Sequence, residues 1–296
     1  MNFTVFYDVV FIGNYTKDTI ITPAGTKYVD GGAVNYSAHA AASLGYKTAV
    51  VTRMAKEDSR VADRFQEAGI ECMVTYTPES TCMKLEYPTI DPDIRTLSVA
   101  STAGSIVAND VRSINAKAAG IGSSLRGEVG LDVILALRQK NMLVAADMQG
   151  FVRVLHGQSL VYEPWDEMVS VLNNLDILKS DAVEAEYLTG EKDIEKAARA
   201  YASLGPKEIV LTHRDGLLIH ADGNFHHFKF HSESMSGRSG RGDTCIGTYL
   251  AKRLNMSPLE AGKWAAAVTS LKVERLGVFD RPITEVETVI QRYYCN

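Results

Sequence analysis

The amino-acid sequence predicts an α/β protein, a three-layer α/β/α sandwich around a mostly parallel central sheet, with a small β lid. Compact apolar runs rich in β-branched residues alternate with helix-like segments along most of the chain, which is the order of a parallel sheet. Residues 71–102 break this alternation with three strand-like segments in succession. The length of 296 residues suits one large domain rather than two. We therefore expect a single domain over residues 1–296, with a lid formed from about 14–33 and 71–102.

The first part of the chain alternates strand and helix. The run VVFIGNY stops at Gly13 in the pattern of a buried strand followed by a sharp turn, and the turn-rich connection ITPAGTKYVDGG comes next. The small residues of VNYSAHAAASLG favour a helix that packs closely on the sheet and ends at Gly45. The strand KTAVVTRM and a helix near 60–68 follow, and this βαβ order predicts right-handed crossovers.

The lid is expected where three strand-like segments follow one another without a helix. They read ECMVTYT, CMKLEYP and RTLSVAST, and turn residues such as Pro78 and Asp91-Pro92 separate them. Consecutive strands joined by short turns favour antiparallel pairing. We expect an antiparallel patch here, outside the parallel sheet.

The alternation returns in the second half of the chain. The expected order is a strand at 141–147, a helix near 165–174, the strand LDILKSD, the helix AVEAEYLTG, a helix at 192–204 and the strand KEIVLTH. The segment GLLIHADGNFHHFKF then predicts a hairpin that turns at Asp222-Gly223-Asn224. From Gly242 onward the apolar period of CIGTYLAKRL and AGKWAAAVTSLKVERL predicts helices.

Composition excludes several classes of protein. The net charge of −5 leaves no basic footprint, so nucleic acid is not an expected partner. No apolar run approaches the ~18 residues of a membrane span, and the N-terminus lacks the pattern of a signal peptide. The four cysteines lie far apart without metal-ligand spacing. These features favour a cytoplasmic protein with reduced thiols and no membrane partner.

The segment SGRSGRGDT carries the expected chemistry. Gly237, Gly240 and Gly242 let backbone N–H groups point inward, and the helix that follows adds the positive end of its dipole. This arrangement predicts an anion hole. Asp243 lies at the start of this helix. Its presence there can also be explained as an N-cap, the commonest reason for Asp at a helix start.

This late motif resembles that of the ribokinase-like (PfkB-type) carbohydrate kinases, which reads roughly D-x-T-G-A/R-G-D. The aligned residues are Gly240, Arg241, Gly242 and Asp243, with Ser239 at the Thr position and Gly237 where the family usually has Asp. The resemblance implies that Gly240 and Gly242 bind the transferred phosphate and that Arg241 contacts its oxygens. It also implies that Asp243 accepts the proton of the attacking hydroxyl, as phosphoryl transfer requires.

The resemblance extends to the substrate side. The segment GGAVNYSAHAAASLG is similar to the early Gly-Gly…Leu-Gly signature, although Tyr36 stands where ribokinase has Asn. Asp18 matches the early Asp that binds substrate hydroxyls in the family, and a solvated turn is its alternative explanation. Arg153, in DMQGFVR, is expected to close over substrate. The implied substrate-binding residues are Asn14, Asp18, Gly31, Gly32, Asn35 and Arg153.

The segment LKSDAVEAEYLTG resembles the family's N-x-x-E motif, with Asp181 at the Asn position and Glu184 at the Glu position. The resemblance implies that both carboxylates help to hold Mg²⁺, mainly through water, which suits the preference of this ion for oxygen ligands. The alternative is structural, because Asp181 and Glu184 have the spacing of a capping box at a helix start.

The nucleotide side is expected at LTHRDGLLIH, which resembles the family's L-T-x-G-x-x-G segment and keeps Thr212 and Gly216. Ser239 of the late motif belongs to the same implied pocket. Ala267 lies on the small-residue face of the last predicted helices, where an adenine edge could fit, and tight helix packing is the alternative.

Taken together, the resemblance implies an ATP- and Mg²⁺-dependent kinase that phosphorylates a hydroxyl of a small polyol, sugar or nucleoside. Likeness to the small-lid members favours a polyol or inositol-type acceptor. The alternative is a catalytically poor ligand-binding or regulatory protein on the same scaffold, suggested by Gly237 in place of the usual Asp. A homodimer formed through the lid is left open by the resemblance.

Overall fold

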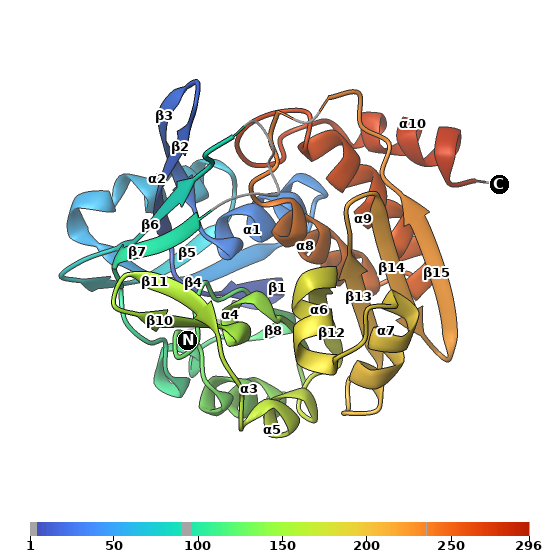
Figure 1. The fold of residues 1–296 in the computed structure, drawn as a ribbon, viewed down its shortest axis with the longest axis horizontal. Helices are drawn as coiled ribbons and strands as arrows, with labels where there is room; N and C mark the ends of the chain where they lie inside the picture. Colours follow the sequence, from blue (N-terminus) through green and yellow to red (C-terminus); the bar gives the residue numbers. More distant parts are fainter. Residues whose placement is uncertain (1–4, 90–95, 235, 296) are drawn as a thin grey trace.

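The computed structural model describes residues 5–89, 96–234 and 236–295, and it has the predicted three-layer arrangement. A nine-stranded sheet runs through the middle, and helices cover both of its faces (Figure 1). A second sheet of six strands stands beside the first. The three-layer fold with an additional smaller sheet is therefore confirmed.

The large sheet is parallel through its centre. Its strand order is β15-β14-β13-β12-β9-β8-β1-β4-β5, and all neighbours from β13 to β5 pair in parallel. Its strands are β1 (Tyr7–Ile12), β4 (Thr48–Ala55), β5 (Glu71–Thr77), β8 (Ala116–Ile121), β9 (Leu143–Asp147), β12 (Ile177–Asp181), β13 (Glu208–Thr212), β14 (Gly216–Ala221) and β15 (Asn224–Lys229). The last two form the predicted antiparallel hairpin, and Asp222 and Gly223 at its turn both have positive φ.

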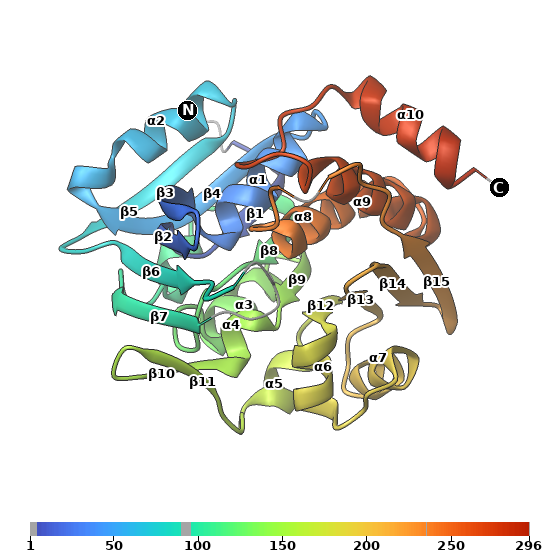
Figure 2. The same ribbon diagram turned by 45° about the horizontal axis from the view of Figure 1, so that its top comes forward.

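Two apolar clusters hold the helices against the two faces of this sheet. One face carries α1 (Ala33–Ser43), α2 (Arg60–Glu67), α8 (Arg241–Arg253), α9 (Pro258–Lys272) and α10 (Ile283–Tyr293). The other face carries α3 (Leu131–Arg138), α5 (Met168–Leu172), α6 (Ala182–Thr189) and α7 (Ile194–Ala202). Figure 2 shows α1, α8 and α9 on one side of the strands and α3, α5 and α6 on the other.

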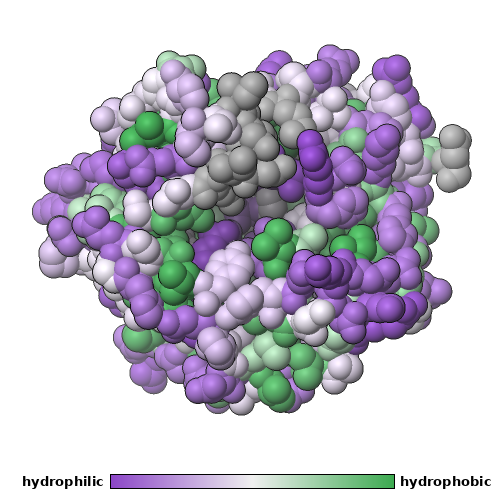
Figure 3. Space-filling model, in the orientation of Figure 1, coloured by the Kyte–Doolittle hydropathy of each residue, from purple (hydrophilic) through white to green (hydrophobic). Residues whose placement is uncertain are grey.

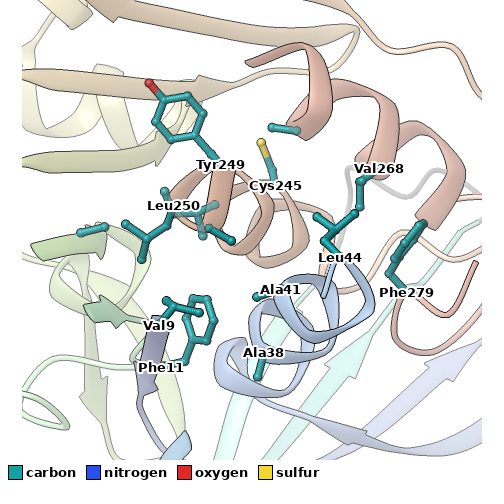
Figure 4. Close-up of a cluster of buried hydrophobic side chains, with 14 of the residues drawn as sticks. Val9, Phe11, Ala38, Ala41, Leu44, Cys245, Tyr249, Leu250, Val268 and Phe279 are labelled. Carbon is teal, nitrogen blue, oxygen red and sulfur yellow. The ribbon is translucent and has the colours of Figure 1, made fainter. Parts of the chain in front are cut away.

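Small residues bring α1, α8 and the sheet close together. Ala38 and Ala41 of α1 lie beside Leu250 and Cys245 of α8 and Phe11 of β1, and all five are buried (Figure 4). This close packing places the N-terminus of α8 over the sheet. The remaining helices are α4 (Gln149–Val152) and the 3₁₀ turns η1 (Lys56–Asp58) and η2 (Ala108–Val111).

The six-stranded sheet has the order β10-β11-β7-β6-β2-β3 and is antiparallel except for the β2–β6 pair. Its strands are β2 (Thr16–Thr22), β3 (Gly25–Gly31), β6 (Thr81–Glu86), β7 (Thr96–Ser101), β10 (Arg153–His156) and β11 (Ser159–Tyr162). The segment read as a turn-rich connection is thus the β2–β3 hairpin, which projects from the body in Figure 1.

Other local expectations need correction. ECMVTYT does not belong to the antiparallel patch, because β5 pairs in parallel with β4 at the edge of the large sheet. The hairpin of β10 and β11 was not predicted, nor was β8, which lies between β1 and β9 at the centre of the large sheet. The turn expected at Asp91-Pro92 lies outside the described residues.

No helix in the described part of the chain is long and apolar enough to span a membrane. Hydrophilic side chains cover most of the face seen in Figure 3, and apolar side chains appear on it in small groups.

Candidate active site

The carboxyl ends of the parallel strands and the first turn of α8 form one site. Asn14 follows β1, Asp147 ends β9, Asp181 ends β12 and Thr212 ends β13. Asp147 and Asp243 line the same cavity, together with residues of β1, β8 and α1. Polar groups at the carboxyl end of a parallel sheet, facing a helix N-terminus, are the usual setting for binding a phosphorylated ligand.

The start of α8 has the geometry of an anion site. Gly240 is its N-cap with φ +75°, a left-handed conformation that favours glycine. The ring of Tyr36 packs on Gly240 so closely that a Cβ there would lie 2.2 Å from a ring carbon. Asp243 is the third helical residue, and no side chain caps this helix. The alternative explanation of Asp243 as an N-cap is therefore wrong.

The Asp243 carboxyl sits among other charges. Burial and the charge of Asp147 raise its pKa to about 6, while Lys179, Arg153 and Lys272 act in the opposite direction. Gln149, in the first turn of α4, places its side-chain amide nitrogen 3.4 Å from Asp243 Oδ1. A carboxylate with a pKa near neutral is suited to exchange a proton at physiological pH.

A buried ion pair lies directly beneath the glycine motif. Lys179 Nζ donates to Asp147 Oδ2 at 2.8 Å, and both side chains are almost fully buried. The Lys179 ammonium lies where a side chain on Gly242 would project, since a Cβ there would be 2.5 Å from Nζ. Burial alone would lower the pKa of Lys179, yet the charges of Asp147 and Glu184 raise it, so the ammonium stays protonated.

Asp181 and Glu184 form the capping box that was the alternative to metal binding. Asp181 Oδ1 accepts from the Glu184 amide at 2.8 Å, and Glu184 Oε2 accepts from the Asp181 amide at 3.0 Å. Burial and the charge of Asp181 raise the pKa of Glu184 to about 7. Arg153, whose side chain is 11% exposed, lies 3.6 Å from Glu184 Oε1 and thus belongs to this end of the site.

On the lid side, Asp18 of β2 faces Gly31 of β3, where an added Cβ would lie 2.2 Å from Asp18 Oδ2. Its other oxygen, Oδ1, is buried without a hydrogen-bond partner. Burial and the charge of Asp243 together raise the pKa of Asp18 to about 6. The same carboxylates raise the pKa of Tyr36. Asp18, Tyr36 and Asp243 therefore share one electrostatic environment, and the solvated-turn explanation of Asp18 is wrong.

The other residues expected on the substrate side bind backbone groups. Asn14 Nδ2 donates to Gly104 O at 2.8 Å, and its Oδ1 is buried without a partner. Asn35 Nδ2 donates to Asp30 O at 3.0 Å. Gly32 lies against Asn14 O, which is 2.7 Å from the position of an added Cβ. Asn14 also lines a second cavity of about 210 Å³ beside the buried Glu128.

The residues expected on the nucleotide side are mostly enclosed by protein. Thr212 is buried at the end of β13, and Gly216 lies against Phe228 O. Ala267 is fully buried in the core shared by α8 and α9, as the alternative of tight helix packing expects. Ser239 accepts a hydrogen bond from Lys272 through its carbonyl oxygen. Arg241 Nη1 approaches Arg214 O at 3.4 Å.

Sequence reasoning missed several residues of this site, namely Asp147, Gln149, Lys179 and Lys272. Asp147 ends a strand, the position at which functional residues are common in parallel sheets. Lys179 is a buried charged residue that directly follows the apolar Ile177 and Leu178 in β12. Lys272 is a cation on a helix of small buried residues. For both lysines the available signal was a charged residue in a segment whose pattern predicts burial, because a buried charge needs a partner.

Comparisons with known proteins agree with this geometry. No family model matches the chain. A sulfate complex of a pyrophosphate-dependent kinase in the ribokinase family is 36% identical, with a TM-score of 0.88 over 94% of this chain and 99% of its own. A complex of such a kinase with a pyrophosphate analog and myo-inositol is 35% identical, with a TM-score of 0.87 over 95% of this chain and 99% of its own.

A cytidine kinase of Thermococcus kodakarensis is 26% identical over 263 residues, which cover 86% of this chain and 91% of that protein. The ribokinase of Arabidopsis thaliana, in complex with ribose and ATP, has a TM-score of 0.75 at 16% identity over 97% of this chain and 99% of its own, a likeness of fold. The identity and coverage of the pyrophosphate-dependent kinase are decisive, and the chain belongs to the ribokinase family.

Proposed function

We propose that the protein is a kinase that phosphorylates a hydroxyl of a small polyol, sugar or nucleoside, with Asp243 as the catalytic base. The observation that carries this proposal is the position of the Asp243 carboxylate. It lies in the first turn of α8, beside the left-handed Gly240, and its pKa is raised to about 6. This position supports a base that acts beside an anion-binding helix start.

In the proposed reaction the acceptor hydroxyl gives its proton to an Asp243 oxygen as its own oxygen attacks the terminal phosphorus of the donor. The bond from phosphorus to the bridging oxygen breaks, and the leaving group departs with that oxygen. Backbone N–H groups at Gly240 and Gly242 and the α8 dipole stabilise charge on the transferred group. Asp18, with its unpartnered Oδ1, is placed to accept a hydrogen bond from an acceptor hydroxyl.

The magnesium ion that the family implies would neutralise charge on the donor phosphates. In this proposal Asp181 and Glu184 would hold it through water with the oxygens that the capping box does not use, Asp181 Oδ2 and Glu184 Oε1, the latter lying 3.6 Å from Arg153. Within the described residues, no group of three or more His, Cys, Asp or Glu side chains is arranged to hold a metal directly.

Two donors are candidates. ATP is the donor that the family resemblance implies. Pyrophosphate is favoured by two observations, the first being the identity of 35–36% to pyrophosphate-dependent kinases. The second is the burial of Thr212 and Ala267, which offers little open surface to an adenosine group.

For the acceptor, the myo-inositol bound to one of these relatives supports a polyol.

The test is formation of phosphorylated product, followed by mass spectrometry, across inositols, pentoses, hexoses and nucleosides. Each acceptor is offered MgATP and magnesium pyrophosphate in parallel. Asp243→Asn should lower kcat on the best acceptor by about 10²–10⁴-fold, with no loss of thermal stability, because the folded pKa of Asp243 is raised. Asp193→Asn, at the exposed start of α7, is the matched control because it also replaces a helix-start carboxylate.

Near-normal turnover in Asp243→Asn would refute the base assignment. Failure of the wild-type protein on every acceptor with both donors would overturn the kinase proposal and favour the ligand-binding or regulatory alternative.

A further inference from the structure

A buried lysine lies under the loop that leads into the anion site. Lys272 is the last residue of α9 and is 3% exposed. Its Nζ donates to Gly237 O at 2.5 Å and also to Ser239 O. These two carbonyls belong to the residues just before Gly240, so the ammonium joins the end of α9 to the glycine motif.

Among the residues that the structure describes, no acidic side chain forms an ion pair with Lys272. The nearby lysine of the site, Lys179, differs because Asp147 neutralises it. A buried cation held only by carbonyl oxygens keeps most of its positive charge, and this charge favours an anion nearby.

The surroundings of Lys272 connect it to the start of α8. The centroid of the Tyr36 ring of α1 lies 5.1 Å from Lys272 Nζ, and the same ring packs on Gly240. The Lys272 charge also acts on the Asp243 carboxyl of α8. The recorded interactions of Lys272 are thus with the loop carbonyls, the Tyr36 ring of α1 and the charge of Asp243 in α8.

We propose that Lys272 is a positioning residue for anion binding: it holds the loop over 237–239 in place and supplies the positive charge that a phosphate at Gly240 neutralises. This role rests on the proposed function but does not require Lys272 to touch the donor. It acts through the backbone of the loop and through the electrostatic potential at the start of α8.

The ionisation of Lys272 makes the role measurable. Burial lowers its pKa to about 8, and the charge of Asp243 opposes this shift. Loss of the proton above that pH removes the unpaired charge. Asp243, with a pKa of about 6, is already ionised in this range, and the raised pKa of Tyr36 keeps its hydroxyl protonated.

The experiment measures sulfate binding by calorimetry at constant ionic strength between pH 6.5 and 9.5, on the full chain. Sulfate is used because it does not titrate in this range. We expect wild-type affinity to fall as pH rises through about 8. Lys272→Met should bind sulfate about tenfold more weakly at pH 7 and show no such fall, whereas Lys272→Arg should retain binding at both ends of the range.

Lys252→Met is the matched control. Lys252 is also a buried lysine with a pKa lowered by burial, and its Nζ lies 3.5 Å from the centroid of the Trp264 ring near the far end of α8. It should bind sulfate as the wild type does. If Lys252→Met and Lys272→Met weaken binding equally, the effect is one of net charge and the proposal is overturned.

Wild-type affinity that does not change with pH, or absence of sulfate binding, would also overturn the proposal. If Lys272→Met fails to fold, the wild-type pH profile and Lys272→Arg still decide the question. Because sulfate binding needs no acceptor, this result is independent of the turnover assay. Normal wild-type turnover with unaltered sulfate binding in Lys272→Met would refute only the role of Lys272.

Discussion

Asp18 and Asp30 lie on adjacent strands of the β2–β3 hairpin, and their surroundings shift their pKa values in opposite directions. Burial raises the pKa of Asp18 to about 6. Burial also acts on Asp30, but hydrogen bonds from Arg60 and Tyr15 lower its pKa overall. Asp30 thus stabilises the fold when it is ionised. Ionised Asp18 destabilises the fold, and its proposed contact with substrate would explain why the residue is present.

We predict that Asp18→Asn raises the free energy of unfolding by roughly 1–3 kcal/mol at pH 8, while weakening acceptor binding. The folded pKa exceeds the unfolded one, so the favourable contribution of Asp18 is present below about pH 4 and is lost as pH rises through about 6. The gain from the variant should therefore disappear at pH 4. Urea unfolding at both pH values measures it.

Asp30→Asn is the control of opposite sign. Its folded pKa is lowered, so the variant should lose stability at pH 8, and the loss should shrink as the solution is acidified. Equal effects of the two substitutions at pH 8 would contradict this assignment of charges.

At the scale of the element, the loop before α8 explains why Gly237 replaces the Asp that is usual in the family. A Cβ at Gly237 would lie 1.6 Å from Arg275 O, and Gly237 N donates to Val273 O at 2.8 Å. The loop therefore rests on the backbone that follows α9, and no side chain fits there. This contact and the hydrogen bonds from Lys272 hold the loop in place, and no acidic residue takes part in them.

We predict that Gly237→Ala destabilises the protein by at least about 2 kcal/mol and weakens sulfate binding, because the loop must move away from α9. Gly157→Ala is the matched control: Gly157 has φ +61° in an open turn with no atom within 4 Å of its added Cβ. It should cost only about 1 kcal/mol of backbone strain and leave sulfate binding unchanged. A Gly237→Ala variant as stable as Gly157→Ala would contradict the tight contact.

At the scale of the whole molecule, the two sheets differ in how much core supports them. The large sheet has an extensive buried cluster on each face, whereas the buried cluster of the small sheet contains only Met83, Leu85 and Val99 among the described residues. Fewer buried apolar contacts predict a lower free energy of local opening. The small sheet also carries Asp18, so its opening would move a proposed substrate contact away from Asp243.

Hydrogen exchange should reveal this difference. We expect amides of β6 and β7 to open with a free energy about 2–4 kcal/mol lower than those of β1, β8 and β9. β15 serves as the control: unlike the interior strands β6 and β7 it is an edge strand, but its Phe228 is buried in the large core. Equal protection of β6 and β8 would contradict the prediction.

Much of the fold follows from local patterns. Apolar runs predicted β1, β9, β12 and β13, and small residues predicted α1, because these signals depend on neighbours in the chain. β8 was missed because AKAAGI has little intrinsic preference for a strand. It is a strand because β1 and β9 pair with it on both sides.

The same division holds for the site. The glycine motif, the helix after it and Asp243 in its first turn could be predicted from the chain alone, since these depend on adjacent residues. The charges around Asp243 depend on the packing of the fold, because Asp147, Lys179 and Lys272 come from β9, β12 and α9. A buried charge needs a partner. Which residue becomes that partner depends on how distant elements pack together, and no local pattern specifies this packing.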